Sequence, residues 1–430
     1  MNEFYLKPKL FSVMKGYTKR KFVNDLIAGI IVAIIALPLS IALALASGVN
    51  PECGVYTAIA AGFIVAVFGG SCIQIAGPTA AFATIVAGVV ANHGMDGLFL
   101  ATVVAGIILI LLGVFKLGSY IRYMPHPITV GFTGGIAVTI LLGQIKDFCG
   151  LTYAEGVRPI ETLEKIEANV HAIGTFSWQA LLVGAISLAI LIIYPKFEKR
   201  LPPSLIAVVL SALAVMFIPA LSDGVYTIGD LYNIPTGLPK MNFGSMDLSL
   251  SKLLSVIPNA FTIAILAAIE SLLSCVVADN MVGSKHNSNA ELVAQGLGNV
   301  ASVFFGGIPA TGAIARTSAN AKNGGSTPIA AIVHVVILLL VLLFLMPYAA
   351  LIPMPTIAAI LFMVAYNMSE WRGFVKIAKT KNVTDIILLF VTFALTVIFD
   401  LVVAIAVGVA VKLLFVLIEK LKAKKTEKTE

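Results

Sequence analysis

The sequence predicts an all-α polytopic membrane protein with fourteen transmembrane segments, and three observations support this fold class. Of the 430 residues, 59% are hydrophobic and 12% are charged, whereas soluble domains contain about 25% charged residues. Apolar stretches close to the roughly 20 residues that cross a bilayer recur along the whole chain. Basic residues gather in alternate loops between these stretches.

The apolar stretches set the expected spans in chain order. The first is a true span rather than a signal sequence, because residues 26–46 are too long for a signal core and lack a sensible cleavage site. The expected spans are 24–47, 54–70, 78–92, 97–116, 128–149, 177–195, 203–220, 255–279, 289–306, 312–322, 327–346, 350–367, 383–399 and 400–420.

The loop charges orient these spans. Loops after odd-numbered spans contain only five basic residues, Lys146, Arg158, Lys165, Lys240 and Lys252, whereas the two ends and the other loops contain the rest. Since cytoplasmic loops are enriched in Lys and Arg, both termini are expected to be cytoplasmic, in a cell inner membrane or plasma membrane. The net charge of +7 follows from this topology and requires no nucleic-acid partner.

The sequence contains no residue pattern that predicts a metal site, a cofactor site or a catalytic site. The four cysteines lie in or beside apolar spans without C-x-x-C spacing, and the five histidines form no metal-binding pair. No Ser/His or paired-Asp constellation falls in the spans, so the chain is not expected to be an enzyme.

Two stretches of the chain resemble one another after a shift of 237 positions. Phe68-Gly69-Gly70 then overlies Phe305-Gly306-Gly307, and each is followed by a segment rich in Gly, Pro, Ala and Thr, at 72–82 and 308–318. Seven spans separate the two copies, so the second is expected to be inverted. Paired interrupted segments in inverted halves point to a transporter's binding site near the membrane midplane.

The residues of these segments suit a helix that begins inside the membrane. Such a start exposes unpaired N–H groups and the positive end of the helix dipole, which favours an anion. Gly77 permits a tight turn, Pro78 suits a first helical turn, and Thr79 adds a hydroxyl donor. In the second copy Gly312 permits the break, and Arg316 and Ser318 fall in the first turns of the following helix.

Two strongly ionisable residues, Glu270 and Arg316, are expected well inside the spans, where such residues are functional candidates. Glu270 is a candidate for proton coupling or cation binding, with Ser274 on the same helix face. A structural Glu270–Arg316 ion pair is the alternative.

Other polar and small residues have simpler interpretations. Pro38 either frees a carbonyl near Ser40 to line a cavity or only kinks the first span. Gly131 and Gly135 favour close helix packing. Four asparagines, Asn280, Asn287, Asn289 and Asn299, are expected to be loop and cap residues around a cytoplasmic turn.

These same residues give the chain its resemblance to the SulP (sulfate permease) anion transporters of the bacterial type. The resemblance rests on motifs at 36–40, 46–48, 77–79, 268–271, 287–299 and 306–317. It implies a homodimer and a seven-plus-seven inverted repeat that works by an elevator-like movement. The implied divisions are a cytoplasmic segment 1–23, a core domain of 24–122 and 255–346, a gate domain of 123–220 and 347–420, and a tail 421–430.

The resemblance also implies site residues. The anion site falls on the starts of the third and tenth spans, with a contribution from Ser40. Its residues are Gly77, Pro78, Thr79, Ala80, Phe82, Ala313, Ile314, Ala315, Arg316 and Thr317, with Phe82 and Ala315 expected to set the pocket volume. Glu270, Ser274 and Gly312 form the ion-coupling set. Sodium-coupled bicarbonate members carry an Asp where this chain has Glu270, and Ile314 stands where a hydroxyl is expected, which favours a proton over sodium.

SulP proteins usually continue into a cytoplasmic STAS domain, whereas this sequence ends at Glu430 after a Lys/Glu tail. Either the chain is a short member or it was truncated, so regulation through that domain is not assumed.

The expected function is proton-coupled symport of a small anion such as sulfate, bicarbonate or a small dicarboxylate. An uncoupled anion channel and a sodium-coupled bicarbonate symporter stay open as alternatives. A nucleobase symporter of the same fold would need polar side chains in both half-helices, where Ala80, Ala81, Phe82 and residues 313–315 are apolar.

Overall fold

The computed structural model describes residues 6–118, 126–157, 159–198, 201–235, 249–380 and 382–398, together with the single positions 237, 247, 404, 407, 408, 410 and 411. The expected last span, 400–420, lies outside the described residues except for five positions. The expected tail, 421–430, and several basic residues used for the topology, such as Arg122 and Arg158, also lie outside them.

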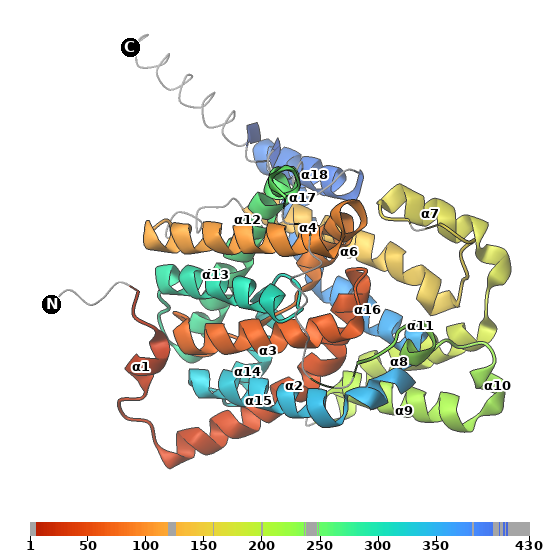
Figure 1. The fold of residues 1–430 in the computed structure, drawn as a ribbon, viewed down its shortest axis with the longest axis horizontal. Helices are drawn as coiled ribbons and strands as arrows, with labels where there is room; N and C mark the ends of the chain where they lie inside the picture. The colour runs from red at the N-terminus through yellow and green to blue at the C-terminus, as the bar shows by residue number, and fades with distance from the viewer. Residues whose placement is uncertain are drawn as a thin grey trace, which may run out of the picture.

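The first half of the chain folds into helices joined by short loops (Figure 1). They are α1 (Lys9–Val13), α2 (Lys19–Ala46), α3 (Pro51–Phe68), α4 (Ala80–Val114), α6 (His126–Cys149), α7 (Thr162–His171), η1 (Ile173–Thr175), α8 (Trp178–Phe197), α9 (Pro203–Phe217), α10 (Pro219–Ser222) and α11 (Ile228–Leu231), with strand β1 (Ala76–Gly77) before α4.

The second half also consists of helices, with one short strand, in its described part. Its elements are α12 (Leu250–Val282), α13 (Ser288–Phe304), β2 (Thr311–Gly312), α14 (Ile314–Lys322), α15 (Pro328–Phe344), η3 (Met346–Leu351), α16 (Met354–Met368), α17 (Trp371–Ala378) and α18 (Val383–Ile398).

Membrane-spanning length and composition are found in six of the described helices, α2, α3, α4, α6, α8 and α12, and α9, α15 and α18 are shorter apolar helices. The label α4 covers two of the expected spans. Gly94 interrupts it with a φ of 69°, a backbone conformation that glycine adopts without a Cβ clash. The expected break between residues 92 and 97 is therefore confirmed.

Helix starts follow ordinary capping chemistry. Side-chain oxygens of Thr18, Ser177, Ser249, Asn287 and Thr327 accept hydrogen bonds from the first-turn N–H groups of α2, α8, α12, α13 and α15. Because these N–H groups have no partner within the helix, each cap satisfies donors that would otherwise be unpaired. Asn287 is therefore a cap residue, as expected.

The helices pack in two groups (Figure 1). In one, α4 packs on α12 and α13, α13 packs on α3, and α15 packs on α2 and α3. In the other, α6 packs on α16 and α18, and α16 packs on α8. Small residues bring the axes close: a Cβ built on Gly106 of α4 would lie 2.7 Å from the Gly296 carbonyl oxygen of α13.

The same effect confirms the expected packing role of Gly131 and Gly135 on α6. A Cβ on Gly131 would lie 2.7 Å from the Leu389 carbonyl oxygen, and one on Gly135 would lie 2.6 Å from Thr396 Cβ. Both partners belong to α18. Larger side chains at these positions would force the two helices apart.

The strands β1 and β2 pair antiparallel, with Ala76 opposite Gly312 and Gly77 opposite Thr311. The Ala313 N–H also donates to the Ile75 carbonyl oxygen at 2.8 Å. Both strands are buried, so their backbone groups require partners within the protein. This pairing brings the starts of α4 and α14 side by side.

Candidate functional site

Buried polar side chains of the neighbouring helices hold the antiparallel pair of β1 and β2, which we call the crossing. Asn299 of α13 donates to the Ala310 carbonyl oxygen at 2.8 Å and accepts from the Ala310 N–H at 2.9 Å. Ser271 of α12 lies 2.7 Å from the Thr311 hydroxyl and accepts from the Gly312 N–H at 3.1 Å. The expectation that Asn299 is a loop or cap residue was wrong, because it lies inside α13 and serves the second strand.

Glu291 of α13 holds the segment that leads into β1. Its carboxylate is fully buried and accepts from the Gly70 N–H at 2.9 Å, from Gln74 Nε2 at 3.0 Å and from Gln295 Nε2 at 2.9 Å. These donors compensate for the loss of water around the carboxylate. Glu291 lies in the first turn of α13, so it adds a buried carboxylate to the two ionisable residues expected well inside the spans.

Asp25 near the start of α2 is a second buried carboxylate that the sequence did not single out. It accepts from the Ser326 N–H at 2.7 Å, from the Thr327 hydroxyl at 2.5 Å and from the Tyr17 hydroxyl at 3.0 Å. Asp25 thereby ties the α14–α15 turn to the start of α2.

A cavity of about 420 Å³ opens beside the crossing strands. One wall consists of the segment before α4, the start of α14, Glu270 of α12, and Leu39 and Leu43 of α2. The opposite wall comes from the other packing group, with Thr133 of α6, Leu191 of α8, Ser204 of α9 and residues 360–370. The cavity therefore lies between the two groups of helices.

Most of the expected site residues line this cavity. They are Pro78, Thr79, Ala80, Glu270, Gly312, Ala313, Ile314, Ala315 and Arg316. The starts of α4 and α14 both have an N-cap residue, Thr79 and Ala313, whose side chain makes no capping hydrogen bond. The positive ends of two helix dipoles therefore meet at one cavity.

Pro78 differs from its expected place in a first helical turn. Helix α4 begins at Ala80, and Thr79 is an extended N-cap residue with φ −130° and ψ 157°. Residues 76 and 77 pair with β2, so the chain remains extended before the helix begins. The Pro78 carbonyl oxygen consequently faces Arg316.

Arg316 is 1% exposed. Its Nη2 donates to the Pro78 carbonyl oxygen, while Nε and Nη1 have no hydrogen-bond partner among the described residues. A guanidinium group is permanently charged and presents its donors in a rigid fork that matches oxyanions. A buried guanidinium with two spare donors at the edge of a cavity is thus suited to an anionic ligand.

Glu270 makes a different contact. Its carboxylate accepts from the Thr79 hydroxyl at 3.0 Å, and no ion pair joins it to Arg316. The alternative of a structural Glu270–Arg316 ion pair is therefore not supported. The described lining of the cavity contains one guanidinium, Arg316, and two carboxylates, Glu270 and Glu370.

Five expected site residues do not line the cavity. Ser40 is buried within α2, and its hydroxyl has no partner among the residues that the structure describes. Phe82 packs in the apolar core, so it does not bound the cavity as expected. The Thr317 hydroxyl accepts from the Ile75 N–H at 3.1 Å and from the Ser274 hydroxyl at 3.2 Å. Thr317 and Ser274 therefore support the crossing and do not line the cavity. The fifth is Gly77.

Gly77 does not line the cavity, but its lack of a side chain leaves room for the guanidinium group of Arg316. A Cβ at this position would lie 2.6 Å from Arg316 Nη1. Any larger residue would push the guanidinium group aside.

Four polar residues of the cavity wall, Thr133, Ser204, Asn367 and Glu370, were not predicted from the sequence. They lie on or beside α6, α9 and α16, far from the repeated segments, and belong to no motif. Glu370 has a left-handed backbone conformation with φ 44°, which is uncommon for a residue with a Cβ.

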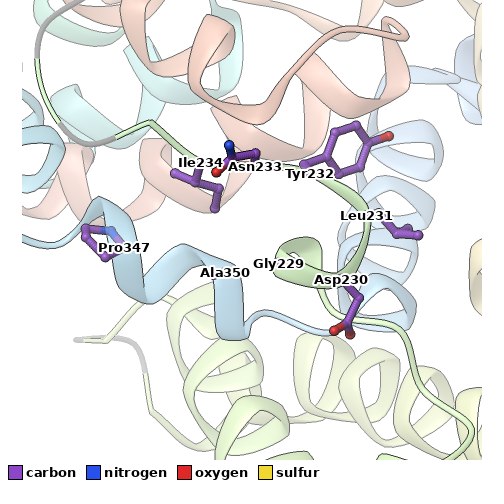
Figure 2. A pocket seen from close by; sticks show the side chains of 8 residues that line it. All are labelled: Gly229, Asp230, Leu231, Tyr232, Asn233, Ile234, Pro347 and Ala350. Atoms are coloured by element: carbon purple, nitrogen blue, oxygen red, sulfur yellow. The ribbon is translucent and has the colours of Figure 1, made fainter.

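Two other cavities lack the chemistry of an anion site. The first, of about 480 Å³, lies between residues 229–234 and η3 (Figure 2), and its described lining contains no basic side chain. The second, of about 680 Å³, is lined by residues around α7 that include Glu164 and Glu167. Its described lining has no Lys or Arg side chain that could attract an anion.

A Ser–His–Asp contact occurs at the turn between α12 and α13. His286 Nδ1 lies 2.6 Å from Asp279 Oδ2, and the Ser288 hydroxyl lies 2.9 Å from His286 Nε2. The N–H groups of Asn289 and Ala290 at this helix start already donate to the Asn287 side chain, so they offer no oxyanion hole. The contact closes the turn.

Known proteins share both the sequence and the fold. A family model described as the sulfate permease family matches residues 22–392. The putative sulfate transporter YvdB of Bacillus subtilis (strain 168) is 46% identical over 407 residues, which cover 93% of this chain and 74% of the relative. The bicarbonate transporter BicA of Picosynechococcus sp. is 32% identical over 408 residues, covering 91% of this chain and 69% of the relative.

Two solved structures are similar. The transmembrane domain of a cyanobacterium bicarbonate transporter BicA has a TM-score of 0.80 at 30% identity, covering 90% of this chain and 98% of that domain. The structure of SLC26A9 has a TM-score of 0.87 at 20% identity, covering 97% of this chain and 68% of that protein, and shows the shared fold alone.

Proposed function

Because the chain belongs to the sulfate permease family, we propose that it transports a small anion, and that the cavity between the starts of α4 and α14 holds this anion. Its family consists of transporters rather than enzymes, and its relatives are named sulfate and bicarbonate transporters. Sulfate, bicarbonate and small dicarboxylates are the proposed substrates.

One observation supports this assignment above the others: the buried Arg316 has two guanidinium nitrogens, Nε and Nη1, without a partner among the described residues, at a cavity where two helix starts meet. Leaving a buried charged donor unpaired is costly, and an oxyanion would satisfy it. Backbone dipoles and one guanidinium recognise charge and size more than chemical identity, which suits a family that includes transporters of different anions.

The proposed coupling ion is a proton carried by Glu270. This carboxylate faces the same cavity as the anion and has the Thr79 hydroxyl as its described donor. Protonation would remove its negative charge, so that anion and proton favour each other in one cavity. Sodium prefers several oxygen ligands, and Ile314 places an apolar side chain where a further hydroxyl would be needed. A sodium-coupled bicarbonate symporter is the second candidate, and the identity to the bicarbonate transporter BicA favours its substrate, bicarbonate.

The wider architecture of this proposal comprises fourteen spans in a seven-plus-seven inverted repeat, with both termini cytoplasmic and two chains in a homodimer. The cavity lies between the two packing groups, which supports an elevator-like movement of a core domain (24–122 and 255–346) against a gate domain (123–220 and 347–420). Such a movement would carry Arg316 and Glu270 together.

Sealed liposomes test both the transport and the coupling. The protein is reconstituted with a trapped pH dye, and an inward gradient of sulfate is imposed without sodium. Radiolabelled bicarbonate uptake is measured separately, since bicarbonate itself changes the internal pH. We expect sulfate entry with internal acidification, and loss of the acidification in Glu270→Gln, which keeps the side-chain size but cannot carry a proton. Glu167→Gln, at an exposed position of α7, is the matched control.

Each other result is decisive. Sulfate entry without a pH change and without an effect of Glu270→Gln would contradict the coupling role and favour an uncoupled channel. Uptake that requires sodium would favour the second candidate. Failure of every tested anion to enter would contradict the transport proposal.

A further inference from the structure

Helix α17 (Trp371–Ala378) and the residue after it present a row of basic side chains that has no role in the function proposed above. Arg372, Lys376 and Lys379 follow one another at spacings of four and three residues, so they share one side of the helix. All three residues are exposed. None of them forms an ion pair with an acidic side chain of the described residues. We call these three residues the basic row.

An exposed apolar pair lies beside the basic row. Trp371 and Val375, one helical turn apart, are 47% and 39% exposed. The guanidinium group of Arg372 lies over the Trp371 ring, 5.4 Å from its centroid, and the indole Nε1 donates to the Tyr366 hydroxyl at 3.2 Å. An exposed indole with a polar edge and an apolar ring is typical of the boundary between a membrane and water.

The opposite side of α17 packs into the protein. Phe374 makes edge-to-face contacts with Phe390 and Phe393 of α18, with ring centroids 5.6 and 5.3 Å apart. Ile377 is buried in a cluster with Val130 of α6. These contacts fix α17 on the second packing group and leave the basic row and the apolar pair facing outward.

The neighbouring surface of α18 is apolar. Phe390, which contacts Phe374 of α17, is itself 48% exposed, and Ile387, one turn away on the same helix, is 37% exposed. Helix α17 connects α16 to α18, and α18 is an apolar helix. The basic row therefore adjoins an apolar surface that suits lipid chains.

The carboxylate at the start of α17 does not belong to this outward surface. Glu370 lines the cavity between the two packing groups. A Cβ built on Gly373 would lie 3.7 Å from Glu370 Oε2 and 3.9 Å from Val130 of α6, so this carboxylate lies on the packed side of α17. The basic row thus keeps its positive charge without a described acidic partner.

We propose that α17 is a docking surface for an anionic phospholipid, with its phosphate headgroup at the basic row and its acyl chains along Phe390 and Ile387. Basic side chains at a bilayer surface attract anionic headgroups, and amphipathic helices with an exposed Trp lie in that boundary. The apolar surface that continues onto α18 favours a lipid over a soluble acidic partner. The inference goes beyond the proposed function, because it depends neither on the transported anion nor on the coupling ion.

Fluorescence quenching tests this inference directly. The sequence contains two tryptophans, Trp178 and Trp371, so Trp178→Phe leaves Trp371 as the single reporter. The whole protein with this replacement is reconstituted in liposomes of equal parts phosphatidylcholine and phosphatidylglycerol, in which one or the other lipid has brominated acyl chains. Bromine quenches an indole only at close range. We expect about two-fold stronger quenching of Trp371 when phosphatidylglycerol is the brominated lipid.

Three variants in this background test whether the charge selects the lipid. The triple variant Arg372→Gln/Lys376→Gln/Lys379→Gln keeps the indole and should make quenching by the two lipids equal. Arg372→Lys preserves the charge and should keep the preference. Replacing the exposed basic residues 19–21 at the start of α2 by Gln removes the same charge well apart from α17 (Figure 1) and should keep the preference as well.

Two results would overturn the inference: equal quenching by the two lipids before the basic row is changed, or a preference that survives in the triple variant. Quenching by neither lipid, together with quenching by aqueous acrylamide, would overturn it too and would assign the surface to a soluble acidic partner. Because no transported anion enters this measurement, its failure would leave the proposed function intact, and a failure of transport would leave this inference intact.

Discussion

The hydroxyl of Thr79, the last residue before α4, donates to the carboxylate of Glu270 in the middle of α12 at 3.0 Å. This contact joins residues that are 191 positions apart in the chain. It connects one of the two helix starts at the cavity to the carboxylate that we propose as the proton carrier. A single hydrogen bond, from Thr79 to Glu270, therefore connects the proposed anion site at this helix start to the proposed proton carrier.

Removing this hydroxyl should alter the coupling. Thr79→Val keeps the side-chain shape and removes the donor to Glu270, so the ionised carboxylate loses its described partner. We expect sulfate-driven proton entry to shift to higher pH, measured as the pH dependence of uptake in liposomes. Thr79→Ser, which retains the hydroxyl, is the control and should behave like wild type. Identical pH profiles for Val and Ser would show that this contact does not tune Glu270.

Arg316 should tolerate no substitution. Lys preserves the charge but lacks the fork of donors that reaches the Pro78 carbonyl oxygen and leaves Nε and Nη1 for a ligand. We expect Arg316→Lys to lose at least about ten-fold in anion uptake at limiting concentration, and Arg316→Gln to lose more. Arg372→Lys, on α17 beside the Trp371 ring, is the matched control. Near-normal uptake by Arg316→Lys would reduce the role of Arg316 to charge balance.

Gly77 should act through Arg316. A Cβ added at Gly77 would lie 2.6 Å from Nη1, so Gly77→Ala is expected to displace the guanidinium group and to reduce uptake about ten-fold or more. Gly88→Ala within α4 is the control, because a Cβ there meets no neighbouring atom within 4 Å. Equal uptake by the two variants would show that the position of the guanidinium group does not limit transport.

Asn299 should matter for stability. Its side chain satisfies both the N–H and the carbonyl of Ala310, and Asn299→Leu leaves both buried groups unpaired. We expect a loss of about 2–5 kcal/mol in unfolding free energy, visible as a lower melting temperature in detergent. Asn323→Leu, which removes one partly buried hydrogen bond to Ala319, should cost less. A smaller effect at Asn299 than at Asn323 would contradict this assignment.

The repeated segments were the part of the site that the sequence predicted well. The shift between Phe68-Gly69-Gly70 and Phe305-Gly306-Gly307 indicated which two stretches break their helices, and these stretches pair as β1 and β2. Their Gly and Pro residues have backbone requirements that are visible without tertiary structure.

Residues that support the crossing were harder to predict. Asn299 follows an evident turn in the sequence and was expected as a loop or cap residue, and Glu291 belonged only to a family motif. Only the packing of α13 against β1 and β2 shows their buried partners. Thr133 and Asn367 reach the cavity from the other packing group. Their contribution depends on how the two groups meet, which no local pattern specifies.

The central claim is that an anion binds in the cavity at the starts of α4 and α14, and substrate protection of a cysteine tests it most directly. Ile314 lines this cavity and is 39% exposed. In Ile314→Cys, with the partly exposed Cys149 replaced by Ser, the rate of modification by a small methanethiosulfonate reagent is measured with and without sulfate or bicarbonate. The account predicts that a transported anion slows modification several-fold and that a non-transported anion does not. Modification at the same rate with every anion that the protein transports would contradict it.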